Sequence, residues 1–280
     1  MSTGKPSNIG VIGLGIIGSR VVENLGKAGF HVYVWSRSPR AVPDFLASPR
    51  DVAQAATVIQ LFVRDDAALI AAMEDMASAL TPQHIVMNHA TVSPAAVHKA
   101  AGIAAKAGTG FLDAPFTGSK NAAAAGKLVY YIGGETSLLE QVRAVLEASS
   151  SKIMHLGKIG DAMVLKIATN MISAVTVKGI AEALAVVRSQ KVEPQKLLEA
   201  LEANANYSAL VGMKLPAMLN EDFEAHFSLR NMLKDADFGR ALAKDGKLTL
   251  TAIDATADAM RQGVNAGKGD LDFSVIGAPQ

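Results

Sequence analysis

A glycine-rich turn near the N-terminus constrains the fold more than any other feature of the chain. The segment Gly13-Leu14-Gly15-Ile16-Ile17-Gly18 follows an apolar run from Asn8 to Ile12 and begins a helical pattern that extends to Ala28. G-x-G-x-x-G between a strand and a helix is typical of dinucleotide-binding domains. Its glycines allow a tight turn, close approach of a pyrophosphate and close packing of helix on strand. The phosphates would bind the free N–H groups at the helix N-terminus. An ordinary turn between a strand and a helix is the alternative.

Strand and helix patterns alternate through the first 160 residues. Apolar runs predict strands at 8–12, 31–35, 57–63, 84–88, 128–132 and 153–156, and helical spacing predicts helices at 16–28, 66–80 and 94–107. The strands are apolar on both faces, which is the pattern of a parallel sheet covered by helices on each side. We therefore expect an α/β domain with a doubly wound parallel sheet of the Rossmann type.

The pattern becomes helical throughout after Gly160. One long helix is predicted from Asp161 to Lys191, because this stretch lacks proline and is apolar around most of its circumference, which indicates a buried helix. Further helices are predicted at 194–203, 208–219, 229–244 and 249–264. We expect a cofactor-binding domain at 1–161, a long interdomain helix at 162–192 and an all-α substrate and dimerisation domain at 193–280. A helix of this length exceeds the width of a small domain, so it should pack against a second copy of the chain in a homodimer or homotetramer.

Composition limits the classes of function. Of the 280 residues 50% are hydrophobic and 19% are charged, a composition that indicates a folded rather than a disordered chain. The net charge of +1 gives no broad attraction to nucleic acid or membrane. The chain has no cysteine, which excludes disulfides, thiol nucleophiles and cysteine-ligated metals, and its six histidines show no metal-ligand spacing, so we expect no metal. No apolar run reaches the ~18–20 residues that span a bilayer. Residues 1–7 lack the apolar core of a signal peptide, and we expect a cytoplasmic protein.

The end of the second predicted strand bears on which dinucleotide binds. An NAD site usually carries an acidic residue here, about twenty residues after the glycines, which binds the ribose 2′-hydroxyl. Trp35 is instead followed by Ser36, Arg37 and Ser38. Arg37 can pair with a 2′-phosphate and stack on adenine, and the two serines can donate hydrogen bonds to the phosphate. The sequence therefore predicts NADP(H) in preference to NAD(H). A solvated loop arginine is the alternative.

Lys166 stands among apolar residues of the long predicted helix. Asn170 follows at i+4, and Thr169 and Ser173 continue the same polar stripe. A lysine is rarely buried without a partner, because desolvation penalises its charge. Facing a cleft, it can polarise a carbonyl and donate a proton to the developing alkoxide, while Asn170 fixes the lysine or holds the substrate. A lysine that extends to solvent from the helix edge is the alternative.

Five segments, in order along nearly the whole chain, resemble the β-hydroxyacid dehydrogenase family. This family includes 3-hydroxyisobutyrate dehydrogenase and the tartronate and glyoxylate/succinic semialdehyde reductases, and its C-terminal domain resembles that of 6-phosphogluconate dehydrogenase. The segments are the cofactor signature at 10–39, an S-T-V-x-P-like loop at 88–94, a D-A-P-V-S-G-G-like loop at 113–120 followed by G-K-L at 126–128, the catalytic G-x-x-x-x-x-K-x-x-x-N pattern within 157–170, and a K-D pair at 234–235.

The resemblance implies a role for each matching residue. Lys166 would be the general acid and base, with Asn170 beside it. The residues implied in substrate binding are Thr91, Thr117, Gly118, Ser119 and Asp235. The residues expected at the cofactor are Gly13, Leu14, Gly15, Ile16, Ile17, Gly18, Ser36, Arg37, Ser38, Val63, Thr91 and Lys234.

Several positions depart from the family pattern. Thr117 stands where serine is usual, Ser119-Lys120 replaces glycine as in the glyoxylate/succinic semialdehyde reductase branch, Phe116 replaces a small aliphatic residue, and His89 replaces the serine before Thr91. These departures bear on the substrate rather than on the type of reaction.

Each of these sites also has a purely structural interpretation. Thr91 is equally suited to cap a helix that begins at Pro94, and residues 117–119 suit an ordinary turn. Lys234 and Asp235 would face solvent if the helix that carries them lies on the surface.

The resemblance implies an NADP-dependent oxidoreductase of the class that acts on CH–OH donors. It would reduce a small aldehyde or keto acid, of the semialdehyde or glyoxylate type, to the hydroxy acid. Two other functions stay open. One is an imine reductase-like enzyme, although such enzymes usually lack the catalytic lysine. The other is a non-catalytic NADP-binding sensor or assembly module.

Overall fold

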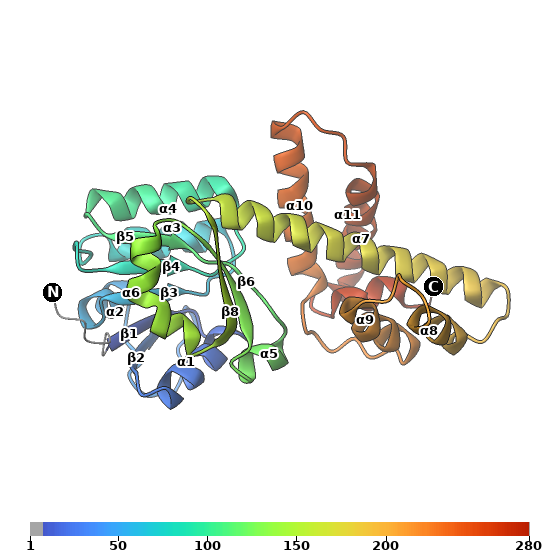
Figure 1. The fold of residues 1–280 in the computed structure, drawn as a ribbon, viewed down its shortest axis with the longest axis horizontal. Coiled ribbons are helices and arrows are strands. Elements are labelled where there is room, and N and C mark those ends of the chain that lie inside the picture. The colour runs from blue at the N-terminus through green and yellow to red at the C-terminus, as the bar shows by residue number, and fades with distance from the viewer. Residues whose placement is uncertain (1–7, 280) are drawn as a thin grey trace. The chain divides into compact units, whose positions relative to one another are not determined.

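The computed structural model describes residues 8–279, and Figure 1 shows the order of the elements. The segment 1–7, in which the sequence shows no signal-peptide core, lies outside the described residues. The chain divides into two compact units, Met1–Lys166 and Ile167–Gln280.

An eight-stranded sheet forms the centre of the first unit. The strands are β1 (Asn8–Ile12), β2 (His31–Trp35), β3 (Val58–Leu61), β4 (Ile85–Asn88), β5 (Gly110–Asp113), β6 (Phe116–Thr117), β7 (Leu128–Gly133) and β8 (Ser150–Gly157). The first five are parallel in the order β2-β1-β3-β4-β5, so their carboxyl ends meet at one edge. β7 then pairs antiparallel with β5 and β6 and parallel with β8. The α/β sheet is confirmed, with an antiparallel extension that the sequence did not predict.

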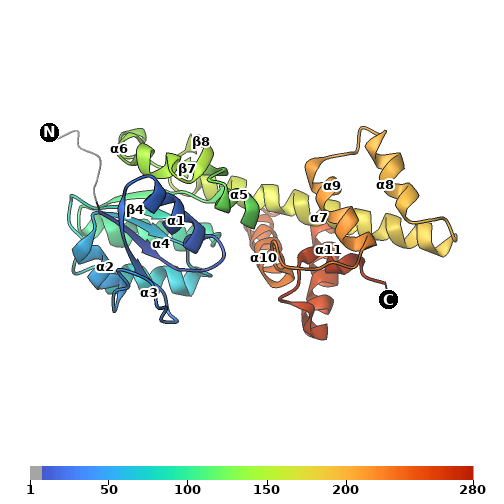
Figure 2. The same cartoon turned by 90° about the horizontal axis from the view of Figure 1, so that it is seen from below.

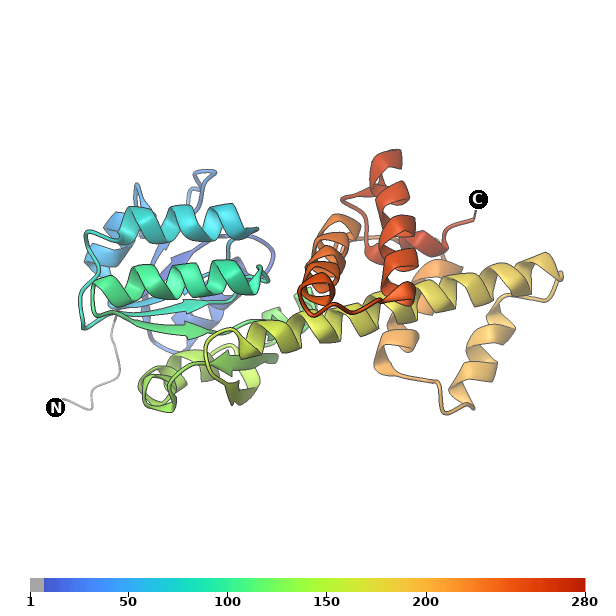
Figure 3. The ribbon, with the colours of Figure 1, turned by 90° about the horizontal axis from the view of Figure 1, so that it is seen from above.

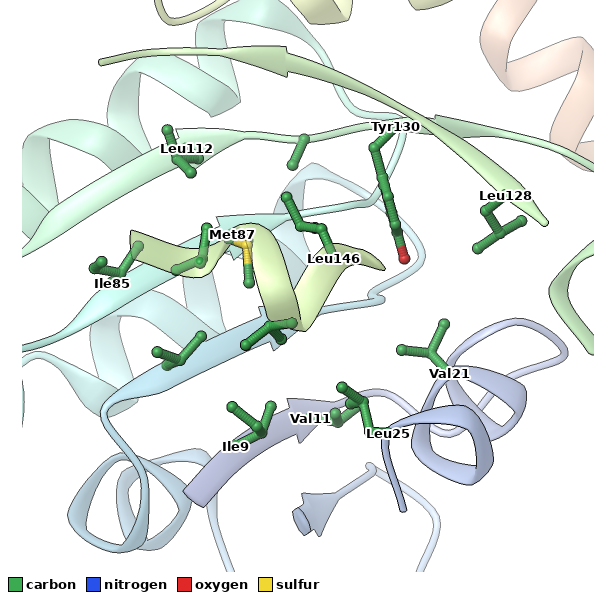
Figure 4. Packing of buried hydrophobic residues seen from close by; sticks show 14 of the residues in the cluster. Ile9, Val11, Val21, Leu25, Ile85, Met87, Leu112, Leu128, Tyr130 and Leu146 are labelled. Carbon is green, nitrogen blue, oxygen red and sulfur yellow. The ribbon is translucent and has the colours of Figure 1, made fainter. Parts of the chain in front are cut away.

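Helices cover both faces of this sheet. They are α1 (Gly18–Lys27), α2 (Pro49–Ala55), α3 (Asp66–Met76), α4 (Pro94–Lys106), α5 (Lys120–Ala124) and α6 (Thr136–Glu147). α3 and α4 lie side by side on one face (Figure 3), in contact with each other. α1 and α6 cover the other face, where their apolar side chains join those of the strands in one core. Figure 4 shows Val21, Leu25 and Leu146 from these helices packed on that face of the sheet.

Helix α7 (Asp161–Ser189) begins in the first unit and ends in the second. The long helix is confirmed, but the expectation that it is buried all round is wrong for the single chain, because Ile172 is 68% and Val186 62% exposed. By length and composition alone α7 is apolar enough to cross a membrane. Its opposite face belongs to the core of the second unit, where Val177 and Leu184 are fully buried.

The regular elements described in the second unit are all helices. It contains α8 (Gln195–Glu202), α9 (Ala209–Leu219), α10 (Leu229–Asp245), α11 (Thr251–Gly263) and the short turns η1 (Val264–Lys268) and η2 (Phe273–Gly277). α10 and α11 pack against each other (Figure 1), and α8 contacts α9 (Figure 2). A buried ion pair between Lys214 and Asp272 joins α9 to the segment just before η2, with N–O distances of 2.8 and 2.9 Å.

Candidate active site

The glycine-rich loop leaves the carboxyl end of β1 and enters α1. Gly13 has a φ of 107°, and a Cβ atom there would lie 2.2 Å from the carbonyl oxygen of Phe62. A Cβ at Gly18 would lie 2.0 Å from the carbonyl oxygen of Gly13. Both glycines are therefore required by the tight turn and by the close approach of α1. At Gly15 no atom lies within 4 Å of the Cβ position, which leaves open space above the backbone.

The N-terminus of α1 is suited to bind an anion. Ile17, at the cap position, makes no side-chain hydrogen bond to the first turn, and that turn contains no acidic residue. Ile16 is half exposed, whereas Leu14 is buried below the loop. The first N–H groups of a helix attract negative charge. Together with the open space at Gly15, they fit the pyrophosphate of a dinucleotide.

The loop after β2 carries a positive charge into solvent. Arg37 is exposed, and among residues 8–279 no carboxylate pairs with it. The hydroxyl of Ser36 donates a hydrogen bond to the carbonyl oxygen of Ser38, across 2.7 Å, which tightens the turn. Val63 follows the neighbouring strand β3 and is half-buried. The loop therefore has the composition expected beside a 2′-phosphate, and the solvated-arginine alternative is still open.

Thr91 lies in the loop between β4 and α4. The cap of α4 is Ser93, whose Oγ accepts a hydrogen bond from the N–H of Ala96 at 3.1 Å, so the interpretation of Thr91 as the cap is wrong. The carboxylate of Asp66, on α3, accepts hydrogen bonds from both the N–H and the hydroxyl of Ser93. The loop that presents Thr91 is thus held by Asp66, a residue that the sequence analysis did not identify.

Two of the departures from the family pattern belong to one aromatic cluster. The ring of His89 stacks on Phe62, with centroids 4.6 Å apart, and lies 4.9 Å from Tyr130. Phe116 lies 6.1 Å from Phe62 and 6.5 Å from Tyr130. Burial lowers the pKa of His89 to about 4, against the opposing effect of its hydrogen bond to Ala114. The ring is therefore neutral at physiological pH, and its Nδ1–H donates to the carbonyl oxygen of Ala114.

The loop at 113–120 turns sharply between β5 and α5. Thr117 pairs with Val129 of β7, and Gly118 is exposed with a φ of 138°. Ser119 caps α5, accepting a hydrogen bond from the N–H of Ala122 at 3.3 Å. Thr117 therefore ends strand β6, and Gly118 and Ser119 connect it to α5. The exposed glycine also leaves this backbone accessible, which is what a bound carboxylate requires.

Asp113, the first residue of this loop, is fully buried. Its Oδ2 accepts a hydrogen bond from the backbone N–H of Met163, at 2.9 Å, in the first turn of α7. Burial raises the pKa of Asp113 to about 7, the N–H groups of Met163 and Gly160 oppose this rise, and the nearby charge of Asp161 adds to it. An acidic side chain thus links the end of β5 to the start of the helix that carries Lys166.

The polar stripe of α7 divides into a buried and an exposed part. Lys166 and Asn170 are each only 8% exposed, whereas Thr169 faces solvent. The alternative of a lysine at the helix edge is therefore wrong. Asn170 Nδ2 donates a hydrogen bond to Oδ2 of Asp235, on α10, at 2.6 Å. The sequence did not predict this bond, and a role of Asn170 beside Lys166 or the substrate stays a prediction.

The two residues of the Lys-Asp pair on α10 differ in their exposure to solvent. Asp235 is fully buried, and its Oδ1 accepts a hydrogen bond from Lys234 Nζ at 2.7 Å. Lys234 is partly exposed, and its Nζ lies 4.8 Å from the centre of the Phe238 ring. The solvent-facing alternative is wrong for Asp235. Within the second unit the structure thus joins Asn170, Asp235 and Lys234 in one chain of contacts.

The predicted site residues of the first unit gather at one edge of the sheet. The glycine loop, Ser36 to Ser38, Val63 and Thr91 follow β1, β2, β3 and β4, and the loop at 113–120 follows β5. Ligands of open α/β sheets bind at this carboxyl edge. Within residues 8–279 no group of three or more His, Asp or Glu side chains is placed to hold a metal ion.

Two family models together match most of the chain. Residues 8–157 match the NAD binding domain of 6-phosphogluconate dehydrogenase, and residues 160–278 match the NAD-binding domain of NADP-dependent 3-hydroxyisobutyrate dehydrogenase. The first match alone spans half of the chain.

Individual relatives agree with these models. The chain is 28% identical to NAD-dependent L-serine dehydrogenase of Pseudomonas aeruginosa, over 96% of each protein. It is 25% identical to glyoxylate/succinic semialdehyde reductase 1 of Arabidopsis thaliana, again over 96% of each. A third relative, the cytokine-like nuclear factor N-PAC of Anopheles gambiae, is 27% identical over 95% of this chain. The match spans only 49% of that longer protein.

The fold has a close counterpart among solved structures. The 3-hydroxyisobutyrate dehydrogenase of Mycobacterium tuberculosis, determined with L-serine, superposes with a TM-score of 0.89 at 26% identity, over 97% of this chain and 98% of the other. The order of motifs, the parallel sheet with its glycine loop and these matches agree. The chain belongs to the β-hydroxyacid dehydrogenase family.

Proposed function

We propose that the protein is an NADP-dependent reductase of small aldehyde or keto acids, which it converts to the corresponding hydroxy acids. Bound NADPH would supply the hydride that reduces the carbonyl carbon. The residues of the chain bind and orient the two ligands, and Lys166 donates the proton to the carbonyl oxygen. In the reverse direction Lys166 accepts that proton as a general base.

The observation that carries the proposal is the environment of Lys166. The side chain is almost fully buried on α7, one helical turn before an asparagine that is held by a buried aspartate. A buried cation stabilises negative charge far more strongly than an exposed one, because the surrounding dielectric is low. The Lys166 ammonium is therefore suited to the oxyanion that develops as the carbonyl is reduced.

The preference for NADP(H) rests on the loop after β2. Arg37 has no carboxylate partner among the described residues, and no acidic residue follows β2 directly. One charge-assisted hydrogen bond to a phosphate contributes about 1.5–3 kcal/mol, or about tenfold or more in affinity. The relatives do not decide this point, since one family model is described as NADP-dependent and one relative as NAD-dependent.

A carboxylate on the substrate is supported by the loop at 117–120. Gly118 leaves its backbone accessible, Thr117 and Ser119 carry hydroxyls, and Lys120 adds a positive charge. This Ser-Lys ending resembles the semialdehyde reductase branch, and a relative with that name is 25% identical. We therefore infer a short aldehyde acid, such as glyoxylate or a semialdehyde, as the preferred substrate.

The decisive experiment is an NADPH oxidation screen with purified wild-type protein and Lys166→Met. The substrates are glyoxylate, succinic semialdehyde, tartronate semialdehyde, methylmalonate semialdehyde and a set of cyclic imines. We expect the highest kcat/KM with an aldehyde acid. Turnover should fall about 10²–10⁴-fold in Lys166→Met, because the variant lacks a general acid. NADPH affinity and melting temperature should change little, since methionine suits an apolar helix.

The screen also separates the other two functions. A higher kcat/KM for cyclic imines than for every aldehyde acid would contradict the carboxylate anchor and favour an imine reductase. NADPH binding without turnover of any substrate would favour a sensor or assembly module, as the relationship to a nuclear factor suggests. Near-normal turnover in Lys166→Met would remove the lysine from the mechanism.

A homodimer or homotetramer is part of the proposal. The exposed face of α7 carries Leu165, Ile172 and Val186, which are large apolar side chains that a second copy would cover. Light scattering at falling protein concentration should give a mass of at least twice 29.2 kDa. A monomer at every concentration would contradict this part of the proposal.

A further inference from the structure

Asp113 occupies a junction between two parts of the proposed site. It is the last residue of β5, and the loop that leads to Thr117 and Gly118 begins at it. Its side chain turns inward, is fully buried, and reaches the backbone N–H of Met163 at 2.9 Å. Met163 lies three residues before Lys166 on α7, so it is on the adjacent turn of the same side of the helix.

The hydrogen bond from Met163 to Asp113 differs from the caps of the other helices. α4, α5, α9 and α10 are capped by the serine that directly precedes them. α7 also has a local acid, Asp161, but its carboxylate accepts a hydrogen bond from the N–H of Lys158, which lies before the helix, at 3.0 Å. The additional acceptor at Met163 comes from a strand 50 residues earlier in the chain.

We propose that Asp113 is a positioning residue for Lys166. Its carboxylate holds the first turn of α7 against the end of β5, and so fixes the lysine relative to the loop at 117–120 that starts from the same strand. In its ionised form the carboxylate also places a negative charge at the positive end of the helix dipole, which strengthens the hold. This inference rests on the proposed function, in which Lys166 donates the proton.

The burial of Asp113 supports a functional reason for the contact. Desolvation raises the pKa of this carboxyl to about 7, so the ionised form is unfavourable for the fold. A cap that served stability alone would be better placed where solvent reaches it, as at Asp65, which caps α3 with a side chain that is 32% exposed. Strongly shifted pKa values cluster at functional sites, so the burial of this acid agrees with the role that its contact to α7 indicates.

The test is a double-mutant cycle with Asp113→Ala and Lys166→Met. Turnover of the best substrate from the screen, the KM for that substrate, the Kd for NADPH and the melting temperature are measured for wild type, both single variants and the double variant. If Asp113 acts through Lys166, Asp113→Ala lowers kcat at least tenfold in the wild-type background. In the Lys166→Met background it lowers kcat by less than twofold. The Kd for NADPH stays within twofold throughout.

Asp161→Ala is the matched control. It removes a carboxylate from the same end of α7 without breaking the link to β5. We expect it to change kcat by less than threefold, even where its melting temperature falls as far as that of Asp113→Ala. An equally large loss of kcat in Asp161→Ala would show that any weakening of this helix end is sufficient, and would overturn the specific role of Asp113.

The outcomes separate the two proposals. Turnover that survives in Lys166→Met defeats the proposed function. Turnover that is lost in Lys166→Met but kept in Asp113→Ala defeats only the positioning role, as does a loss of the same factor in both backgrounds. If Asp113→Ala does not fold, Asp113→Asn takes its place, because it keeps the shape without the charge. It should lower kcat at least threefold in the wild-type background only, and an unchanged kcat overturns the inference.

Discussion

Asn170 donates a hydrogen bond from Nδ2 to Oδ2 of the fully buried Asp235, across 2.6 Å. A carboxylate is an acceptor, so the bond fixes which end of the Asn170 amide faces α10. The same carboxylate accepts from Lys234 at 2.7 Å. The amide one helical turn after Lys166 is therefore held in a single orientation by residues of another helix.

Replacement of Asn170 by alanine should lower kcat with little effect on NADPH affinity. The buried carboxylate of Asp235 would lose a donor, at a cost of about 1–3 kcal/mol, and Lys166 would lose its oriented neighbour. We expect kcat to fall about 5- to 150-fold in steady-state NADPH oxidation. Ser173→Ala is the control, since that hydroxyl bonds only the carbonyl oxygen of Thr169 on its own helix. Equal activity in the two variants would show that the Asn170–Asp235 bond is not used in catalysis.

Replacement of Arg37 by alanine should remove the preference for NADP(H). The loss of one charge-assisted contact predicts about tenfold or more weaker binding of NADPH, with the Kd for NADH unchanged. Fluorescence titration with each nucleotide measures both constants. Arg143→Ala, on α6 and paired with Glu140, is the control for the loss of a surface charge. Equal affinities of the wild-type protein for NADPH and NADH would already contradict the prediction.

Periodicity predicted the parallel part of the fold but not its antiparallel extension. The run Leu128 to Ile132 is apolar in the same way whichever direction the strand takes, so its pairing with β5 was not encoded in the pattern. The strand at Gly110 to Asp113 was missed because only Phe111 and Leu112 are apolar in it, which is too short an apolar run to stand out. α6 was missed although its buried residues are regularly spaced. The glycine loop was predicted correctly because its conformation depends on residues that are adjacent in the sequence.

The site residues that the sequence analysis did not identify make their contacts only in the folded structure. Asp66 and Asp113 have no local pattern that separates them from surface acids, and only the fold brings them to Ser93 and Met163. The cap of α4, in contrast, could have been predicted from neighbouring residues alone. Proline favours the first helical position, which makes the preceding Ser93 the cap rather than Thr91.

The second unit should depend strongly on the ion pair between Lys214 and Asp272. Asp272→Ala leaves the Lys214 ammonium, only 5% exposed, without its carboxylate, which costs about 3–5 kcal/mol. Urea unfolding at pH 7 measures this loss. Asp270→Ala is the matched control, because its pair with Arg230 is at the surface and contributes about 1 kcal/mol or less. A loss of similar size in both variants would contradict the importance of burial.

The same pair predicts a loss of stability in acid. Burial acts to raise the pKa of Asp272, but the hydrogen bond and charge of Lys214, together with hydrogen bonds from Ser274, outweigh it and hold the pKa below its ordinary value of 3.8. The stabilisation is therefore present above pH 3.8 and is lost as the pH falls through the lower pKa of the folded state. The difference in unfolding free energy between wild type and Asp272→Ala should shrink in urea titrations below that pH.

For Asp113 we expect the opposite dependence of stability on pH. Its pKa in the folded protein is about 7, against an ordinary value of 3.8, so between pH 3.8 and pH 7 the folded state binds a proton that the unfolded state has lost. The contribution of Asp113 to stability therefore falls as the pH rises through this range. Asp113→Asn should gain melting temperature relative to wild type between pH 5 and pH 8, as measured by differential scanning calorimetry. A constant difference across that range would contradict the raised pKa.

The open space above Gly15 has a consequence for how proteins of this fold can diverge. Side chains at positions 13 and 18 would collide with the backbone, but a methyl group at position 15 would meet no protein atom within 4 Å. Packing therefore does not require glycine at position 15, and the close approach of the proposed nucleotide would be the reason for it. A descendant that no longer needed the nucleotide would be free to acquire a side chain there while keeping its architecture. Such a lineage would be recognised by a filled position 15 between two retained glycines.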